Sequence, residues 1–227
     1  MKTFLCFIGA LLLASCKGGS DTESRNGSES SSDREGVTKS DRKNQPSDIV
    51  IIETSMGTIR AKLHPNSAPI TVENFLSYVD KGHYDETIFH RVMSNFMIQG
   101  GGFKMTDGFP KELKTGSGIT NESADSQKNT RGTLAMARTN DPNSATAQFF
   151  INVKNNPNLD HPNMGGYAVF GEVIEGMDVV DAIKEVETGQ KIALSLGAND
   201  RYETGEFSDV PVELVTIQSI KRAPKSE

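Results

Sequence analysis

The chain has 227 residues, of which 35% are hydrophobic and 24% are charged, a composition typical of a folded protein rather than a fibrous or disordered one. Its formal net charge of −6 argues against a nucleic-acid-binding protein, because such proteins usually present a basic surface. Both cysteines, Cys6 and Cys16, lie near the N-terminus, so the rest of the chain has neither a disulfide framework nor a thiolate metal site.

The first fifteen residues have the features of a bacterial export signal. Lys2 supplies a positive charge, and the apolar run from Phe4 to Leu13 is too short to span a bilayer. The run ends in Leu13-Ala14-Ser15-Cys16, which looks like a lipobox. We therefore expect residues 1–15 to be a lipoprotein signal peptide and Cys16 to carry the lipid. The alternatives are an ordinary secretory signal with an incidental cysteine and a buried core helix.

Residues 16–47 are expected to form a disordered tether. From Lys17 to Pro46 the only aliphatic residue is Val37, so the segment cannot bury enough apolar surface to offset the entropy lost on ordering. A flexible tether of this kind has an end-to-end distance on the order of 30 Å. We expect it to hold a folded domain at the bacterial cell envelope, anchored through Cys16 and facing the periplasm or the exterior.

A single domain is predicted over residues 48–224, followed by a tail at 225–227. Ile49–Ile52 and Thr58–Leu63 have strand patterns and flank a turn at Ser55-Met56-Gly57, which predicts an opening hairpin.

Two amphipathic helices are expected in this domain. The first is indicated by apolar residues at helical spacing and by Gly82 at the position of a C-terminal cap; these apolar residues are Ala68, Val72, Phe75, Leu76 and Val79. The second runs from Met177, with Val180, Ile183 and Val186 on one face. Further strands are predicted at Ile88–Val92, Phe96–Gly100, Thr133–Arg138, Gln148–Val153, Tyr167–Val173 and Val212–Ile220. Many short strands with two helices indicate an antiparallel barrel or sandwich.

The familiar signatures of covalent, phosphate and metal chemistry do not occur. The sequence has no Gly-x-Ser-x-Gly elbow, no phosphate-binding loop and no His-Glu-x-x-His motif. The four histidines lack metal-ligand spacing; they are His64, His83, His90 and His161. We therefore expect neither a cofactor nor a metal.

Four segments place one or two polar side chains among aromatic, Met or small residues. They are Phe89-His90-Arg91-Val92, Phe96-Met97-Ile98-Gln99-Gly100-Gly101, Gly132-Thr133-Leu134-Ala135-Met136-Ala137-Arg138 and Ser144-Ala145-Thr146-Ala147-Gln148-Phe149-Phe150-Ile151. Taken singly, each is also compatible with a plain core strand, since aromatic residues in strands are usually buried in the core.

Together and in this order, the four segments closely resemble the cyclophilins, especially the compact bacterial branch. The likeness extends from about Asp48 to Pro224 and includes Val169-Phe170-Gly171 and Glu175-Gly176-Met177. The resemblance implies a closed eight-stranded antiparallel β-barrel capped by two α-helices. It also implies peptidyl-prolyl cis/trans isomerase activity on proline-containing polypeptides.

The resemblance also implies a set of site residues. Arg91 matches the catalytic arginine, and Gln99 would hold its guanidinium group in place. Phe96, Met97 and Phe150 match the floor of the proline pocket, and Leu159 matches an apolar wall. Gln148 gives polar support together with Gln99. The backbone of Ala137, Arg138 and Thr139 matches the segment that pairs with the bound peptide.

Two positions depart from the best-known eukaryotic pattern. Asn158 stands where a Trp often precedes the wall leucine, which places tight cyclosporin binding in doubt. Tyr167 replaces a histidine at the pocket rim and keeps an aromatic wall with a hydroxyl donor. Residues Gln190 to Val210 form a longer and more polar segment than in compact members, which we interpret as a surface loop.

Three functions are consistent with these features. The leading one is an isomerase that assists the folding of extracytoplasmic proteins, and nothing in the sequence suggests a dimer interface, so we expect a monomer. The second is a module that binds proline-containing segments without significant turnover. The third is a structural envelope lipoprotein. The intact set of pocket residues favours the enzyme, because binding alone would tolerate loss of Arg91.

Overall fold

The computed structural model describes residues 48–197 and 201–224. All of the described residues belong to a single compact unit of the chain. The expected signal peptide at 1–15, the tether at 16–47 with its lipidated Cys16, and the tail at 225–227 lie outside the described residues. Within the described ranges, no helix is long and apolar enough to cross a membrane.

The described residues form eleven strands and two α-helices. The strands are β1 (Ile49–Thr54), β2 (Gly57–Leu63), β3 (Thr87–Met93), β4 (Met97–Thr106), β5 (Phe109–Glu112), β6 (Thr133–Met136), β7 (Phe149–Asn152), β8 (Val169–Glu175), β9 (Thr188–Leu196), β10 (Tyr202–Pro211) and β11 (Thr216–Arg222). The helices are α1 (Pro69–Asp80) and α2 (Met177–Lys184), with short 3-10 turns η2 (Pro157–Leu159) and η3 (Asn163–Gly165).

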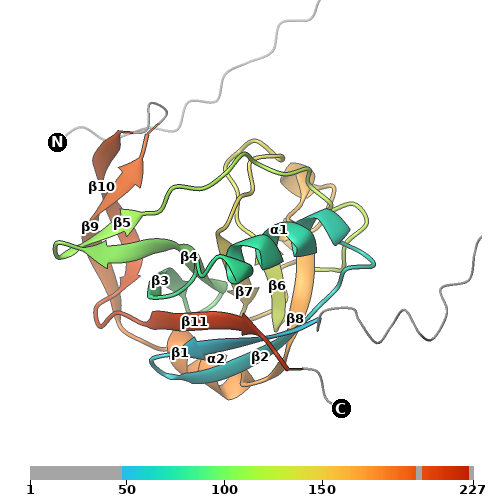
Figure 1. Cartoon of the computed structure of the whole chain (residues 1–227), viewed down its shortest axis with the longest axis horizontal. Coiled ribbons are helices and arrows are strands. Elements are labelled where there is room, and N and C mark those ends of the chain that lie inside the picture. The colour runs from blue at the N-terminus through green and yellow to red at the C-terminus, as the bar shows by residue number, and fades with distance from the viewer. Residues whose placement is uncertain (1–47, 198–200, 225–227) are drawn as a thin grey trace, which may run out of the picture. The chain divides into compact units, whose positions relative to one another are not determined.

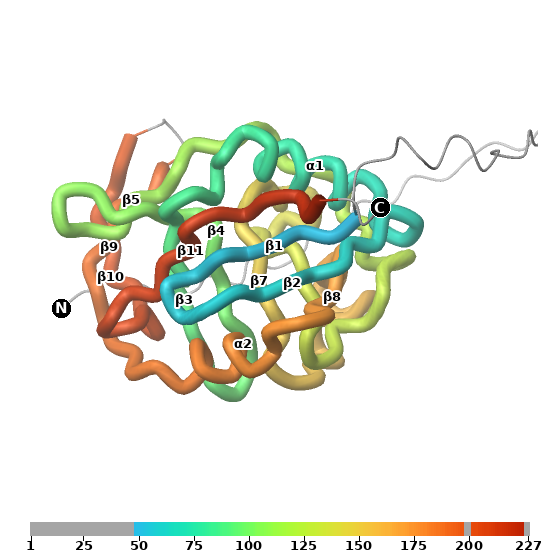
Figure 2. Tube along the Cα trace, turned by 60° about the horizontal axis from the view of Figure 1, so that its bottom comes forward, coloured from blue at the N-terminus to red at the C-terminus, as the bar shows by residue number. Residues whose placement is uncertain are grey.

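Eight of the strands in the described part of the chain close into a barrel in the order β4-β3-β11-β1-β2-β8-β6-β7. All neighbours in this ring are antiparallel, and the ring closes where β7 pairs with β4, with Ile98 opposite Ile151 and Gln99 opposite Phe150. Helices α1 and α2 lie on opposite sides of the barrel strands (Figures 1 and 2). The predicted closed eight-stranded antiparallel barrel with two helices is therefore confirmed.

Helix α1 covers the barrel with the apolar face that its sequence predicts. Phe75 is fully buried at the centre of this face, and its ring contacts those of Phe149 and Phe170 at centroid distances of 5.7 and 4.9 Å. The helix ends at Asp80, and Gly82 follows with φ +65°, a left-handed conformation that glycine adopts without the strain of a side chain.

The alternation of side chains along the strands separates the barrel core from a second apolar cluster. Phe149 and Ile151 of β7 belong to the main core, whereas Phe150 between them does not. Because successive residues of a strand point to opposite faces, Phe150 lies on the outer face of the barrel wall. There it packs with Met97, Ala135, Leu159 and Val169.

The segment from Gln190 to Val210, which the sequence predicts as a surface loop, forms strands β9 and β10. These strands pair antiparallel, with Ile192 opposite Glu206, and we call them the β9–β10 ribbon. The prediction was wrong because the apolar contacts of the segment are made with residues far away in the sequence, such as Phe207 with Phe103, which the polar composition of the segment does not indicate. The ribbon extends the sheet beyond the barrel through β5 (Figure 1).

Candidate active site

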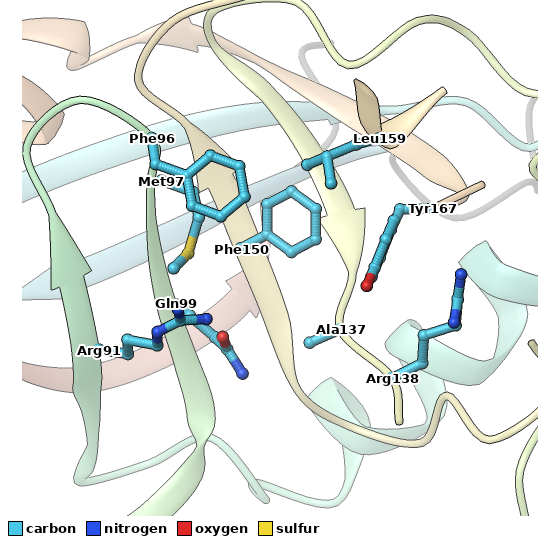
Figure 3. Close-up of a pocket in the computed structure, with 9 residues that line it drawn as sticks. All are labelled: Arg91, Phe96, Met97, Gln99, Ala137, Arg138, Phe150, Leu159 and Tyr167. Atoms are coloured by element: carbon cyan, nitrogen blue, oxygen red, sulfur yellow. The ribbon is translucent and has the colours of Figure 1, made fainter. Parts of the chain in front are cut away.

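A pocket of about 100 Å³ opens on the outer face of the barrel wall formed by β3, β4, β6 and β7 (Figure 3). It brings together residues that are up to 76 positions apart in the sequence, from Arg91 to Tyr167. Its lining residues are Arg91, Phe96, Met97, Gln99, Ala137, Arg138, Phe150, Leu159 and Tyr167. All nine are among the site residues that the sequence predicts.

The floor of the pocket is apolar and almost completely buried. Met97 is 2% exposed, and Phe150 and Leu159 are each 4% exposed. The ring of Tyr167 meets that of Phe150 edge to face, with centroids 5.9 Å apart at 72°, a favourable arrangement for two aromatic rings. The close packing around these side chains holds the floor in place. A floor of this kind suits a small apolar ring better than a charged or flexible group.

Arg91 stands at the rim of this floor. It lies on β3 opposite Gln99 of β4, so the two side chains leave the same face of the sheet side by side (Figure 3). The Arg91 side chain is 42% exposed, and its Nε lies 3.9 Å from Oδ2 of Asp209 in β10. Because arginine stays protonated at any physiological pH, it brings a permanent cation to the apolar floor.

A chain of side-chain hydrogen bonds runs from Gln99 away from the pocket. Nε2 of Gln99 donates to Oε1 of Gln148 at 3.0 Å, and Nε2 of Gln148 donates to Oε1 of Glu112 at 3.2 Å. Gln148 lies against Gly102, where a Cβ atom would collide with its side chain. The role of Gln99 in holding Arg91 stays a prediction, because it would use the side-chain oxygen of Gln99 as acceptor, whereas the hydrogen bond to Gln148 uses its nitrogen.

A second cavity of about 220 Å³ adjoins the first and shares Gln99, Ala137 and Arg138 with it. Its other lining residues include Thr139 and Gln148, the two predicted site residues that the first pocket lacks. Three more of its lining residues, Glu112, Ser144 and Thr146, are not among the site residues that the sequence predicts. Ser144 and Thr146 belong to the last of the four motif segments, from Ser144 to Ile151, whereas nothing near Glu112 in the sequence marks it.

Arg138 fixes the rim of the pocket rather than pointing freely into it. Its guanidinium donates to the carbonyl oxygens of Met164 at 2.7 Å and of Gly166 at 2.9 Å. It also lies over the ring of Tyr167, 4.2 Å from the centroid. These contacts tie the segment that follows β6 to the segment before β8 and hold Tyr167 beside the floor (Figure 3).

The family model for cyclophilin type peptidyl-prolyl cis-trans isomerases matches residues 49–221. A peptidyl-prolyl cis-trans isomerase of Streptomyces antibioticus is 53% identical over 176 residues, covering 76% of this chain and 96% of its own. Peptidyl-prolyl cis-trans isomerase B of Escherichia coli is 48% identical, covering 76% of this chain and 98% of its own. The chain belongs to the cyclophilin family.

A solved cyclophilin structure agrees with this assignment. The cyclophilin type isomerase of Cryptosporidium parvum, crystallised in the presence of the dipeptide Ala-Pro, superposes with a TM-score of 0.60 at 26% identity. The match covers 78% of this chain and 99% of that one. Most of the described residues therefore adopt the cyclophilin fold.

Behind the floor of this cyclophilin site, a buried network of amide side chains holds the loops in place. Nδ2 of Asn156 donates to Oδ1 of Asn152 at 2.7 Å and to the carbonyl of Phe96 at 2.9 Å. Asn152, which is fully buried, donates in turn to Oγ1 of Thr133 at 2.9 Å and Oδ1 of Asn129 at 3.2 Å. The network connects the pocket residue Phe96 to the strands of the barrel.

His90, which precedes Arg91 in the sequence, is kept neutral by its surroundings. His90 is 4% exposed, with its ring centroid 4.6 Å from that of Phe103. Burial, with a smaller contribution from the Arg91 cation, lowers the pKa of His90 to about 4, although interactions with the Ile88 backbone and Gln148 oppose the shift. His90 is therefore uncharged at neutral pH.

Within the described residues, no three His, Cys, Asp or Glu side chains gather in a group that could hold a metal ion. What the site offers is an apolar floor, a permanently charged donor at its rim and a row of amide groups. These can bind and polarise a peptide segment, and none of them forms a nucleophile–base pair of the kind used in covalent catalysis.

Proposed function

We propose that this chain catalyses the cis/trans interconversion of X-Pro peptide bonds in the pocket lined by Arg91 and Phe150. The observation that carries the proposal is the placement of the Arg91 guanidinium beside a buried apolar floor, in a pocket of about 100 Å³. The membership of the cyclophilin type isomerases supports the same conclusion.

The reaction needs no bond to be made or broken. Rotation about a peptide bond has a barrier of roughly 18–20 kcal/mol, because the twisted amide loses its resonance. Uncatalysed exchange at proline takes tens to hundreds of seconds. Shortening this to about a millisecond requires a factor of about 10⁵, or roughly 7 kcal/mol of transition-state stabilisation.

The residues of the pocket can supply this stabilisation in two ways. Met97, Phe150 and Leu159 hold the proline ring, so that the preceding carbonyl group rotates while the ring stays fixed. In the twisted state the prolyl nitrogen regains a lone pair, and the Arg91 guanidinium donates a hydrogen bond to it. The backbone of Ala137 to Thr139 pairs with the bound peptide beside the ring.

We further propose that the protein works as a monomer outside the cytoplasm, anchored by a lipid on Cys16, and assists the folding of extracytoplasmic proteins. The support comes from the sequence: the apolar run that ends in Leu13-Ala14-Ser15-Cys16 and the polar segment at 16–47 that follows it. The cis/trans isomerisation of proline limits the folding rate of many chains. An isomerase at the envelope would therefore speed the folding of proteins exported there.

The decisive experiment is a protease-coupled isomerisation assay on a proline tetrapeptide. The proposal expects the purified protein to accelerate the slow phase in proportion to its concentration. Binding of the peptide without acceleration would favour a proline-binding module instead. A protein that neither binds nor accelerates would be a structural envelope lipoprotein, and the proposed function would be wrong.

A further inference from the structure

The β9–β10 ribbon lies beside the active-site pocket and contacts it at two points. The ribbon stands next to β5 and β4 at one side of the barrel (Figures 1 and 2). One of its contacts reaches Arg91 directly, and the other reaches Gln99 through a chain of hydrogen bonds. Both residues line the pocket, and the proposed mechanism requires Arg91 in a fixed position.

The ribbon is held firmly on the barrel. Phe207 of β10 packs against Phe103 of β4, with ring centroids 5.4 Å apart at 69°. Ala193 of β9 is 1% exposed and lies in the same cluster as Ile88 of β3. Because this cluster joins both ribbon strands to β3 and β4, the ribbon is positioned relative to the strands that carry Arg91 and Gln99.

At the first contact, Asp209 faces Arg91 from an irregular position in β10. The register with β9 shifts between Phe207 and Val210, so Asp209 lies in a β-bulge, and its φ of +61° is left-handed. Aspartate tolerates this conformation better than most residues. Val210, which follows, is 1% exposed and fixes the bulge, and Oδ2 of Asp209 lies 3.9 Å from Nε of Arg91.

At the second contact, Glu112 connects the ribbon to the amide groups of the site. The backbone N–H of Leu196 in β9 donates to Oε2 of Glu112 at 2.8 Å, and the hydroxyl of Tyr202 in β10 donates to the Glu112 carbonyl at 3.1 Å. The other carboxylate oxygen of Glu112 accepts from Gln148, which accepts from Gln99. The Glu112 carboxylate therefore links the ribbon to the side-chain amides of Gln148 and Gln99.

We propose that the β9–β10 ribbon is a positioning element of the isomerase site, and that Asp209 is the positioning residue for Arg91. The inference rests on the proposed function, in which Arg91 donates to the twisted prolyl nitrogen. A long, half-exposed arginine side chain samples many rotamers, and only those that reach the substrate are productive. The Asp209 carboxylate at Nε restricts this sampling and leaves the terminal NH₂ groups for the substrate.

The test is Asp209→Asn, which removes the charge and keeps a residue that tolerates positive φ. With an uncharged proline tetrapeptide we expect kcat and kcat/KM to fall together by about tenfold with KM unchanged, because the lost effect concerns the transition state only. Asp209→Gly, which also accepts the bulge geometry, is expected to do the same. Glu206→Gln, an exposed charge on the same strand, is the matched control and is expected to keep wild-type kinetics.

A double-mutant cycle with Arg91→Ala separates this inference from the proposed function. We expect Asp209→Asn to have no further effect once Arg91 is absent, since its effect passes through the arginine. Wild-type kinetics for both Asp209 variants, or an equal loss with and without Arg91, would overturn the positioning role. If Arg91→Ala itself keeps full activity, it is instead the proposed mechanism that fails.

Discussion

The side-chain amide of Gln99 donates a 3.0 Å hydrogen bond to the side-chain oxygen of Gln148, and this bond joins the two cavities of the site. Gln99 lines both cavities, while Gln148 lines the second and is fixed on its far side by Glu112. A peptide bound across the site would therefore meet one connected row of amide groups. The rigidity of that row comes from β4 and β7, which pair directly beside it.

Replacement of Arg91 by alanine should leave the fold intact and reduce turnover by about two orders of magnitude or more, as loss of one key transition-state donor does elsewhere. The side chain is partly exposed on a strand, so its removal creates no cavity in the core. The measurement is kcat/KM in the protease-coupled assay, with circular dichroism as the check on folding. Arg60→Ala, on β2 and paired with Glu175, is the control arginine and should keep full activity. Unchanged turnover in Arg91→Ala would contradict the mechanism.

Cyclosporin should inhibit this protein weakly. Asn158 lies exposed in η2, immediately before the buried wall residue Leu159. In the family, a Trp at this position supplies an aromatic surface and a hydrogen bond to the inhibitor. Their loss should weaken binding by a few kcal/mol, or roughly a hundredfold or more. Asn158→Trp should therefore strengthen inhibition far more than it changes turnover, which an inhibition titration on both proteins measures. Nanomolar inhibition of the wild type would show that Asn158 is not at that rim position.

The proposed lipid anchor predicts that replacement of Cys16 by alanine leaves the protein unlipidated and shifts it from the membrane fraction to the soluble fraction. The reason is that the thiol of Cys16 is the only group in the lipobox-like sequence able to carry the lipid. Fractionation after a high-salt wash, with Cys6→Ala as the matched control, measures the effect. Equal membrane retention of the Cys16 variant and the wild type would refute the anchor.

Stability should fall as the pH drops below neutral, in part because of His90. Its pKa is lowered from 6.5 to about 4 by burial, so the unfolded chain binds a proton at a higher pH than the folded one. Stability therefore decreases as the pH falls from about 6.5 to about 4, by up to about 3 kcal/mol from this group alone. His90→Gln, which cannot titrate, should show a smaller loss between pH 7 and pH 4.5 in denaturant unfolding. Identical pH dependence in both proteins would mean that folding does not lower the pKa of His90.

Replacement of the buried Asn152 by alanine should destabilise the fold by about 2–3 kcal/mol, because its removal leaves the polar groups of Asn129, Thr133 and Asn156 without their partner in the interior. Denaturant unfolding measures the change. The matched control is Asn158→Ala on the surface nearby, for which a change within about 0.5 kcal/mol is expected. A loss for Asn152→Ala no larger than the control would show that the network adds little.

The local pattern predicts much of this fold. The apolar residues of α1 recur at helical spacing, and the alternation in Thr58–Leu63 places a strand where β2 is found. The pattern failed for the β9–β10 ribbon, where each strand finds its apolar partners in distant residues such as Phe103 and Ile88. Contacts of this kind depend on how the chain folds back and leave no periodic signal in the segment itself.

The sequence by itself determined the family through its ordered motifs, and the resemblance implied the barrel with its two helices and the side chains that gather in the pocket. Tertiary structure alone decided that β9 and β10 pair into a ribbon beside the site, where the sequence predicted a surface loop. It also decided that Asp209, 118 positions after Arg91, comes to face it. The physical reason is that strand pairing and the packing of Phe207 on Phe103 fix these neighbours, and such long-range contacts are set by the closed barrel as a whole.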